Sequence, residues 1–163
     1  MRNTRICSSI QNKLKANEVS IHEIRAEETY AVRQEILRPG RPPEEVRFAG
    51  DLDSTTLHLG AFLENRLVGI ATYVQNSHKD FDFPYQYQLR GMAVLPEVQK
   101  MRIGERILKA GENLLKEQKN VGFLWCNARE TAVEFYRRNN YQTHGKYFEI
   151  PHVCTHIVMY KVL

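Results

Sequence analysis

The chain has 163 residues, which corresponds to one domain that is large enough to bury a hydrophobic core without disulfide bonds. Hydrophobic residues make up 42% and charged residues 26%, and these values exclude a disordered, collagen-like or coiled-coil chain. No apolar run approaches the roughly 18–20 residues that a membrane-spanning helix needs. A net charge of +4 would suggest nucleic-acid binding if the charge lay on a folded surface.

The positive excess is confined to the N-terminus, which contains no acidic residue before position 18 and four basic ones, Arg2, Arg5, Lys13 and Lys15. Residues 18–89 carry 12 acidic and 7 basic side chains, net −5, whereas residues 90–163 carry 12 basic and 7 acidic ones, net +5. We therefore expect a flexible basic arm at residues 1–17 and a single, neutral domain at residues 18–163. This distribution disfavours nucleic-acid binding, and it suits a cationic ligand on the first half and an anionic one on the second.

Cysteine usage and the N-terminus predict a cytoplasmic protein. The cysteines are Cys7, Cys126 and Cys154, an odd number at wide spacing that implies no disulfide framework. The N-terminal segment lacks the apolar core of a signal peptide. Cys126 lies in an apolar segment, which is typical of an inert buried thiol.

The first half of the chain predicts strands around one helix. Residues 19–25 alternate weakly and predict a strand, and residues 27–37 predict a helix with acidic residues in its first turn. The proline-rich segment 38–43 ends that helix. Residues 56–63 and 67–74 predict a β-hairpin around a short polar turn.

The second half alternates strands and helices, which favours α/β packing. Strands are predicted at 87–94, at 121–126 and, as two strands around Pro151, over about 144–162. An apolar face with helical spacing predicts a helix over 103–119. Thr131 and Glu134 have the spacing of a capping box, which predicts a helix that begins at Thr131 and ends at Asn139.

The segment between Arg90 and Leu108 has the features of an anion site. A strand that stops at a proline is followed by a short polar loop and a helix that opens near Gly104. Free N–H groups at a helix start bind anions, and Gly104 allows close approach of a phosphate. Lys100, Arg102 and Arg106 add positive charge, and the glycine patterns of triphosphate and dinucleotide loops are absent. On spacing alone, an ordinary strand-to-helix turn fits equally well.

Here the sequence resembles the GNAT superfamily of N-acetyltransferases. The acyl-CoA loop of that family has the form Arg/Gln-x-x-Gly-x-Gly/Ala after a strand that ends in a hydrophobic-Pro pair. The segment Gln99-Lys-Met-Arg-Ile-Gly104 matches its first and last positions, and Arg102 replaces the middle glycine. An arginine can present its backbone N–H there, provided that the loop does not need a positive φ.

A second match to the family begins at Ala132 and follows its pattern Ala-x-x-Phe-Tyr-x-x-x-Gly-Phe, with Asn140-Tyr141 in place of Gly-Phe. Asparagine suits the glycine position because it tolerates the left-handed conformation. The family often has an asparagine where this chain has Arg129, and Asn127 is a candidate replacement. Segments 37–43, 50–53 and 148–152 are similar to a bacterial subgroup of the family that has no settled substrate.

The resemblance implies an α/β GNAT (acyl-CoA N-acyltransferase) fold, with a mixed, mostly antiparallel sheet, flanking helices and splayed central strands. Acetyl-CoA, the implied cosubstrate, would lie between strands 87–94 and 121–127, with its pyrophosphate on the amides of 99–104. A backbone N–H near Val94 would polarise the thioester carbonyl. The implied cofactor-binding residues are Met92, Ala93, Val94, Gln99, Lys100, Met101, Arg102, Ile103, Gly104, Glu105, Asn127 and Tyr136.

The resemblance also implies transfer of acetyl to a primary amine, on a small molecule or peptide, by direct attack in a ternary complex. The amine must attack as the free base, and the leaving thiolate benefits from a general acid. Tyr136 matches the acid of the family, although its helical spacing also fits a core aromatic residue. Glu149 and His152 are candidate bases in the tail that would border the acceptor pocket, and a water chain is the alternative to both.

Other functions receive less support. A single zinc ion cannot bind His152, Cys154 and His156 on one strand, because i and i+4 lie ~13 Å apart, so we expect no metal. A CoA-binding or regulatory module with little turnover on the same fold is the alternative to an enzyme. The expected partners are acetyl-CoA and an amine, without a membrane or nucleic acid, and a homodimer is left open. The N-terminal acidic residues that favour a cationic amine are Glu27, Glu28, Asp51 and Asp53.

Overall fold

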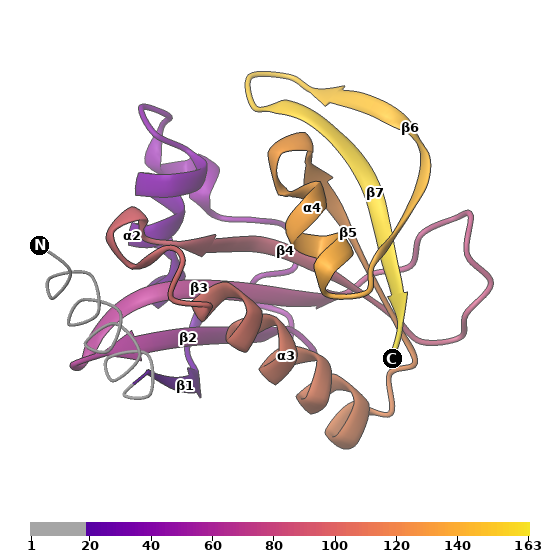
Figure 1. The fold of residues 1–163 in the computed structure, drawn as a ribbon, viewed down its shortest axis with the longest axis horizontal. Helices are drawn as coiled ribbons and strands as arrows, with labels where there is room; N and C mark the ends of the chain where they lie inside the picture. The colour runs from indigo at the N-terminus through magenta and orange to yellow at the C-terminus, as the bar shows by residue number, and fades with distance from the viewer. Residues whose placement is uncertain (1–18) are drawn as a thin grey trace, which may run out of the picture.

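The computed structural model describes residues 19–163, so the predicted basic arm at residues 1–17 lies outside the described part of the chain. A seven-stranded sheet with the order β1-β2-β3-β4-β5-β7-β6 forms its centre (Figure 1). The strands β4 and β5 are parallel, and every other neighbouring pair is antiparallel. The strands are β1 (Ser20–Glu23), β2 (Leu57–Leu63), β3 (Arg66–Gln75), β4 (Gln86–Val94), β5 (Phe123–Arg129), β6 (Gln142–Ile150) and β7 (Cys154–Val162).

The helical segments connect these strands largely where the sequence predicts helices. The α-helices are α2 (Ala26–Val32), α3 (Ile103–Lys119) and α4 (Val133–Arg138). The predicted helix at 27–37 continues beyond α2 as a π-helix, η1 (Arg33–Leu37). Short 3₁₀ turns are η2 (Pro43–Val46), η3 (Pro96–Val98) and η4 (Glu130–Ala132). No helix within residues 19–163 is both long and apolar enough to cross a membrane.

Helices cover both faces of the sheet, and two neighbouring residues of β3 show which helix lies on which face. The side chains of Thr72 and Tyr73 point to opposite faces because residues alternate along a strand. Arg33 Nη2 donates a hydrogen bond to Thr72 Oγ1 at 2.8 Å, which places η1 on one face. The Tyr73 hydroxyl lies 3.3 Å from the Ile107 carbonyl oxygen and 3.4 Å from that of Leu108, which places α3 on the other. The predicted mixed sheet with flanking helices is confirmed.

The predicted capping box at Thr131 is wrong. Thr131 lies inside the 3₁₀ turn η4, and α4 starts after Ala132 without a side-chain cap. The reason is that β5 continues to Arg129, past the predicted end at residue 126, because residues 127–129 pair with β7. The chain therefore enters the helix through a tight turn directly from the strand.

A β-bulge in β4 changes the direction of the strand near its C-terminal end. Thr72 pairs with Arg90 and Ile70 pairs with Ala93, so two steps on β3 face three steps on β4. Gly91 lies in this bulge with φ of +63°, a conformation that favours glycine. The bulge lies directly after the segment in which β4 pairs with β5.

Gly111 allows α3 to pack closely on the sheet, and replacing it should destabilise the fold. A Cβ atom at this position would lie 2.1 Å from Cζ of Tyr73, which is fully buried. Although alanine favours a helix by about 1 kcal/mol over glycine, displacing a buried tyrosine costs about 1–3 kcal/mol. We therefore expect Gly111→Ala to lower the free energy of unfolding in urea. The exposed Asn113→Ala on the same helix is the control and should leave stability equal or higher; equal stability of both variants would contradict the packing argument.

Candidate active site

The two parallel strands at the centre of the sheet separate and leave a cavity. β4 and β5 pair only from Gln86 with Phe123 to Leu89 with Cys126. Beyond this point β5 pairs only with β7, and the edge of β4 that faces β5 has no strand partner within residues 19–163. A cavity of about 180 Å³ opens there, lined by residues of both strands and by η1, Phe48, α4 and the β6–β7 region. This opening is the predicted cleft between splayed strands.

Tyr136 lies in this cavity on α4, as predicted for the general acid. Its side chain is buried, and its hydroxyl lies 3.8 Å from Sδ of Met92 in the bulge of β4. Burial raises the pKa of the Tyr136 hydroxyl well above its ordinary value, so the group keeps its proton at neutral pH. The neighbouring thiol of Cys126 is also buried, and burial raises its pKa, which leaves it protonated and poorly nucleophilic.

The predicted acyl-CoA loop connects η3 to α3. Arg102 adopts φ of +60° and Lys100 φ of +71°, so the condition that this loop keeps a negative φ at Arg102 is not met. Arg102 instead adopts the left-handed conformation, which is uncommon for a residue other than glycine. The Arg102 guanidinium pairs with Glu105 at 2.8 Å, and that pairing is the main reason why the pKa of Glu105 falls to about 2.

The backbone around this loop fits an extended ligand with an anionic group. The first-turn N–H groups of α3 have no intrahelical acceptor, and no side chain caps the helix at Arg102. Residues 90–94 of β4 present the unpaired strand edge described above. Gly104, in the first turn of α3, lies against β4: a Cβ atom there would lie 3.4 Å from Met92 of β4 and 3.5 Å from Phe135 of α4. The helix start and the strand edge are therefore neighbours. A pyrophosphate suits the helix start, and amide groups suit the strand edge.

The two predicted general bases lie outside the residues that line the cavity. Glu149 is exposed on β6, and its carboxylate accepts a hydrogen bond from the hydroxyl of Thr155. His152 is exposed in the turn between β6 and β7, with φ of +62°. Of the predicted cofactor-binding residues, Met92, Asn127 and Tyr136 line the cavity.

His156 lines the cavity, although the sequence analysis considered it only as a metal ligand. Its ring is buried on β7, and Nδ1 lies 2.6 Å from the carbonyl oxygen of Cys154. A carbonyl can only accept, so Nδ1 carries the proton and Nε2 keeps a free lone pair. Burial lowers the pKa of His156, and the charges of Arg129 and Arg38 lower it further, so the ring is neutral at pH 7.

Comparison with known proteins identifies the family of this site. Residues 19–141 match the model of the Acetyltransferase (GNAT) family. The chain belongs to the GNAT family. The uncharacterized N-acetyltransferase YitI of Bacillus subtilis (strain 168) is 34% identical over 145 residues, which cover 89% of this chain and 97% of that protein. This GNAT protein is therefore an N-acetyltransferase, as the two motifs predicted.

Solved structures share the same fold. A putative N-acetyltransferase from Lactobacillus plantarum superposes with a TM-score of 0.71 at 17% identity, over 90% of this chain and 99% of that one. An aminoglycoside 6'-N-acetyltransferase complexed with coenzyme A superposes with a TM-score of 0.68 at 14% identity, over 88% of this chain and 96% of that one. The predicted GNAT fold is thus confirmed.

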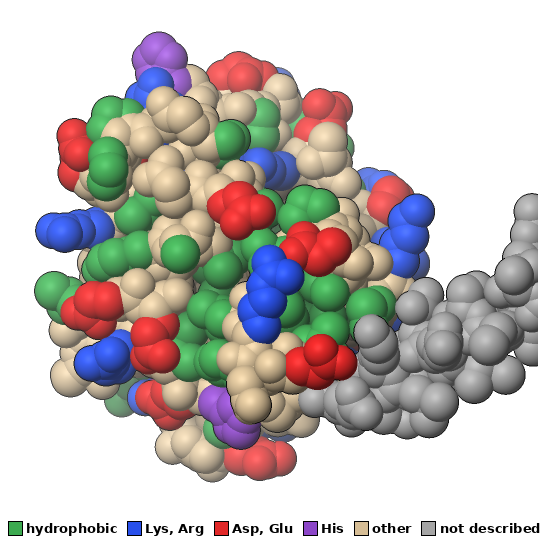
Figure 2. Space-filling model, turned by 90° about the vertical axis from the view of Figure 1, so that its left-hand side faces the viewer, with side chains coloured by type: hydrophobic (Ala, Val, Ile, Leu, Met, Phe, Trp, Pro, Cys, Tyr) green, Lys and Arg blue, Asp and Glu red, His purple; other side chains and the backbone are tan. Residues whose placement is uncertain are grey.

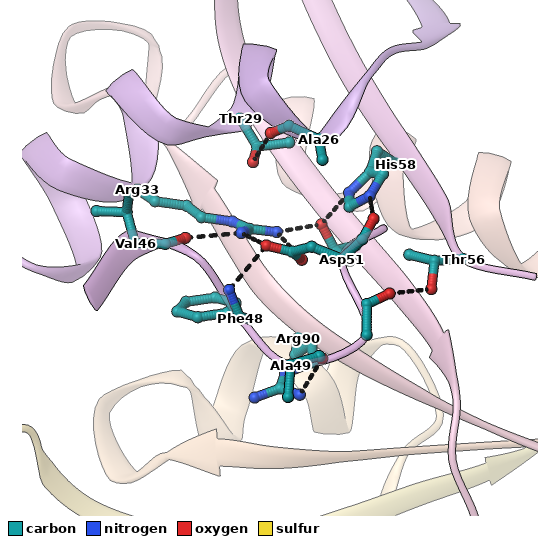
Figure 3. A network of polar contacts seen from close by, with 12 residues as sticks. Ala26, Thr29, Arg33, Val46, Phe48, Ala49, Asp51, Thr56, His58 and Arg90 are labelled. Atoms are coloured by element: carbon teal, nitrogen blue, oxygen red, sulfur yellow. Dashed lines mark hydrogen bonds and ion pairs between the residues drawn. The ribbon is translucent and has the colours of Figure 1, made fainter. Parts of the chain in front are cut away.

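A buried ion pair lies next to Phe48 and Gly91, which line the cavity (Figure 3). The side chains of Arg33 and Asp51 are 0% and 3% exposed, and Nη1 lies 2.5 Å from Oδ2. Arg33 also donates to the Val46 carbonyl oxygen at 2.8 Å, and His58 bridges Thr72 Oγ1 and the Asp51 carbonyl oxygen at 2.8 Å each. The Asp51 carboxylate therefore neutralises Arg33 inside the fold and does not face an acceptor amine.

The other acidic residues that favoured a cationic amine do not line the cavity either. Glu27 and Glu28 lie in the first turn of α2, where Glu28 pairs with Arg25, and Asp53 is exposed. Figure 2 shows acidic and basic side chains interspersed on the face drawn there, without a continuous basic surface. None of these four acidic side chains therefore lines the cavity.

Neutralising Asp51 should destabilise the protein strongly, because it leaves the Arg33 charge buried without a counter-ion. We expect Asp51→Asn to lower the free energy of unfolding by about 3–5 kcal/mol, measured by denaturant titration. Glu45→Gln is the matched control, because it removes the partly exposed pair with Arg41, and such pairs contribute little. Equal stability of the two variants would contradict the role assigned to the buried pair.

Proposed function

We propose that this GNAT protein transfers acetyl from acetyl-CoA to a primary amine by direct attack in a ternary complex. One observation carries the proposal: a protonated tyrosine and a neutral histidine line the same cavity between the separated strands, beside an unpaired strand edge. Amine acetylation needs both groups, because the amine must lose a proton and the thiolate gains from receiving one.

The residues of this chain that would hold acetyl-CoA lie on two elements. Within the predicted loop 99–104, the N–H groups of Gln99 and Met101 already donate to backbone carbonyls. The N–H groups at the start of α3 would therefore bind the pyrophosphate, and the edge of β4 around Met92, Ala93 and Val94 would pair with the amide groups of the pantetheine arm. Acetyl-CoA supplies an acetyl thioester, whose carbonyl a backbone N–H near Val94 would polarise.

Tyr136 and His156 would carry the proton transfers. The Tyr136 hydroxyl holds its proton because burial raises its pKa, and it would donate to the leaving sulfur. His156 Nε2 has a free lone pair because Nδ1–H donates to the Cys154 carbonyl, and it would accept the proton of the amine. We assign the base to His156 in preference to Glu149 and His152, because only His156 lines the cavity with Tyr136.

Thermal unfolding with acetyl-CoA, followed by thiol release over a panel of primary amines, tests the function. We expect acetyl-CoA to raise the melting temperature by mass action, and at least one amine to release the thiol. Absence of stabilisation would contradict cofactor binding, and stabilisation without turnover on any amine would favour a CoA-binding module instead.

In the same assay, Tyr136→Phe should lower kcat by ~10²-fold or more, because a general acid contributes a factor of this size. Acetyl-CoA should stabilise the variant as it stabilises the wild type. Tyr147→Phe is the matched control, because Tyr147 is 49% exposed on β6 and does not line the cavity. Unchanged kcat in Tyr136→Phe would remove its role as the acid.

The pH dependence of kcat/KM tests the base. The pKa of His156 lies below its ordinary value of 6.5, so its neutral form predominates at pH 7 and is lost as the pH falls through that lowered pKa. Because the proton of the bound ammonium passes to His156 inside the complex, log kcat/KM should rise with pH with a slope of about one below the His156 pKa and level off above it. In His156→Asn, whose amide can still donate to the Cys154 carbonyl, we expect a slope of about one throughout.

His152→Asn is the control for this profile and should keep the break in slope, because His152 does not line the cavity. A break that disappears in His152→Asn and persists in His156→Asn would assign the base to His152.

A further inference from the structure

The cavity wall contains three arginines and no acidic residue among the described lining residues. Arg38 follows η1, Arg90 lies on β4 beside the bulge, and Arg129 ends β5. All three are half-buried, so their charges lie partly out of water. A cavity with this composition repels a cation and attracts an anion.

The three guanidinium groups are held in place by backbone carbonyls. Nη1 of Arg38 and Nη2 of Arg129 both donate to the Leu37 carbonyl oxygen at 3.0 Å, and Nη1 of Arg90 donates to that of Ala49 at 3.1 Å. The ring of Phe48 lies 5.4 Å from Cζ of Arg38 and 5.2 Å from Cζ of Arg90. Each guanidinium therefore keeps several N–H donors for a ligand.

No ion pair joins any of these three arginines to a carboxylate within residues 19–163. The carboxylates that act electrostatically on Arg90 and Arg38, those of Asp51 and Glu45, are themselves paired with Arg33 and Arg41. Two of the arginines also repel each other: burial lowers the pKa of Arg38, and the charge of Arg129 lowers it further. Their charge is thus left without a close counter-ion inside the fold.

We propose that the acceptor amine carries a carboxylate or phosphate group, which Arg38, Arg90 and Arg129 bind in the cavity. The inference rests on the proposed acetyl transfer and names the class of its acceptor: a small amine with an anionic group. Guanidinium groups bind both anions through paired N–H donors. None of residues 99–104 lines this cavity, so the arginines form a site apart from the helix start assigned to the pyrophosphate.

The test compares primary amines that differ only in the charge of the second group. Pairs of amino acids and their carboxamides, with spacers of increasing length, vary the charge at nearly constant shape, and diamines of equal length supply the cationic members. Phosphoethanolamine against ethanolamine separates a phosphate from a carboxylate preference. We expect kcat/KM to be ~10- to 100-fold higher for the preferred anionic amine than for its neutral partner, because hydrogen bonds to charged groups are strong. Higher kcat/KM for neutral or cationic amines would overturn the proposal.

Variants that remove a single charge test whether the arginines cause this preference for anionic amines. Arg90→Gln and Arg129→Gln should each lower the ratio of kcat/KM for the anionic amine to that for the neutral one by ~10-fold. Stabilisation by acetyl-CoA should persist in both variants, and its loss would instead assign these arginines to the cofactor. Arg138→Gln removes the same charge from an exposed position on α4 and is the matched control. An unchanged ratio in both cavity variants would overturn the assignment.

Binding without turnover separates this inference from the proposed function. The same amines are titrated into the protein with CoA, and the melting temperature is recorded. Stabilisation by anionic but not neutral amines, without acetylation of any amine, would support the anion site and contradict acetyl transfer. Acetylation of amines without any preference for the anionic members would support acetyl transfer and overturn the anion site.

Discussion

The buried ion pair between Arg33 and Asp51 is the constraint on which the candidate site depends. Removing both charges from water costs several kcal/mol per ion, and hydrogen bonds to the pair offset part of this cost. The Val46 carbonyl and the Thr72 hydroxyl accept from Nη1 and Nη2 of Arg33, whose Nε is buried without a hydrogen-bond partner, and His58 connects Thr72 to the backbone of Asp51. The pair thus holds η1 and the loop before β2 against β3 of the sheet.

The same pair sets the positions of groups that line the cavity. Asp51 accepts a hydrogen bond from the Phe48 N–H at 2.8 Å, and the Phe48 ring lies 4.2 Å from Cζ of Arg33 and against two arginines of the cavity wall. On its other side, Arg33 approaches the bulge of β4, where a Cβ on Gly91 would lie 3.1 Å from Nε. The bulge and part of the cavity wall therefore both pack against the buried pair.

The sequence predicted those features that depend on local patterns. The strand and helix periodicities located the elements, and the motif positions at Gly104 and Tyr136 indicated the family and the fold. Asn140 adopts φ of +68°, as expected of an asparagine in place of glycine, and Arg102 shares this conformation against expectation. Arg102 thus has a conformation that its residue type rarely adopts, which a pattern of residue types cannot predict.

The features that the sequence missed depend on contacts between distant residues. Arg33 bonds to Thr72, 39 positions away, and Arg129 bonds to the Leu37 carbonyl, 92 positions away. Summing charges over each half of the chain predicted an acidic acceptor side, but the sum does not tell which way a side chain points. The alternation of β7 would place Cys154 and His156 on one face, yet the free Nε2 of His156 follows only from the contact of Nδ1 with a carbonyl.

The arginines of the cavity also bear on the protonation of the acceptor. An amine in water is mostly an ammonium ion at neutral pH, and only the free base attacks a thioester. Like charges nearby and partial burial both lower the pKa of an ammonium group, as they lower that of His156 in the same cavity. An anionic group on the acceptor would offset the repulsion at the cavity wall while the reacting nitrogen loses its proton to His156. The same positive charges can therefore bind one end of the acceptor and favour the reactive form of the other.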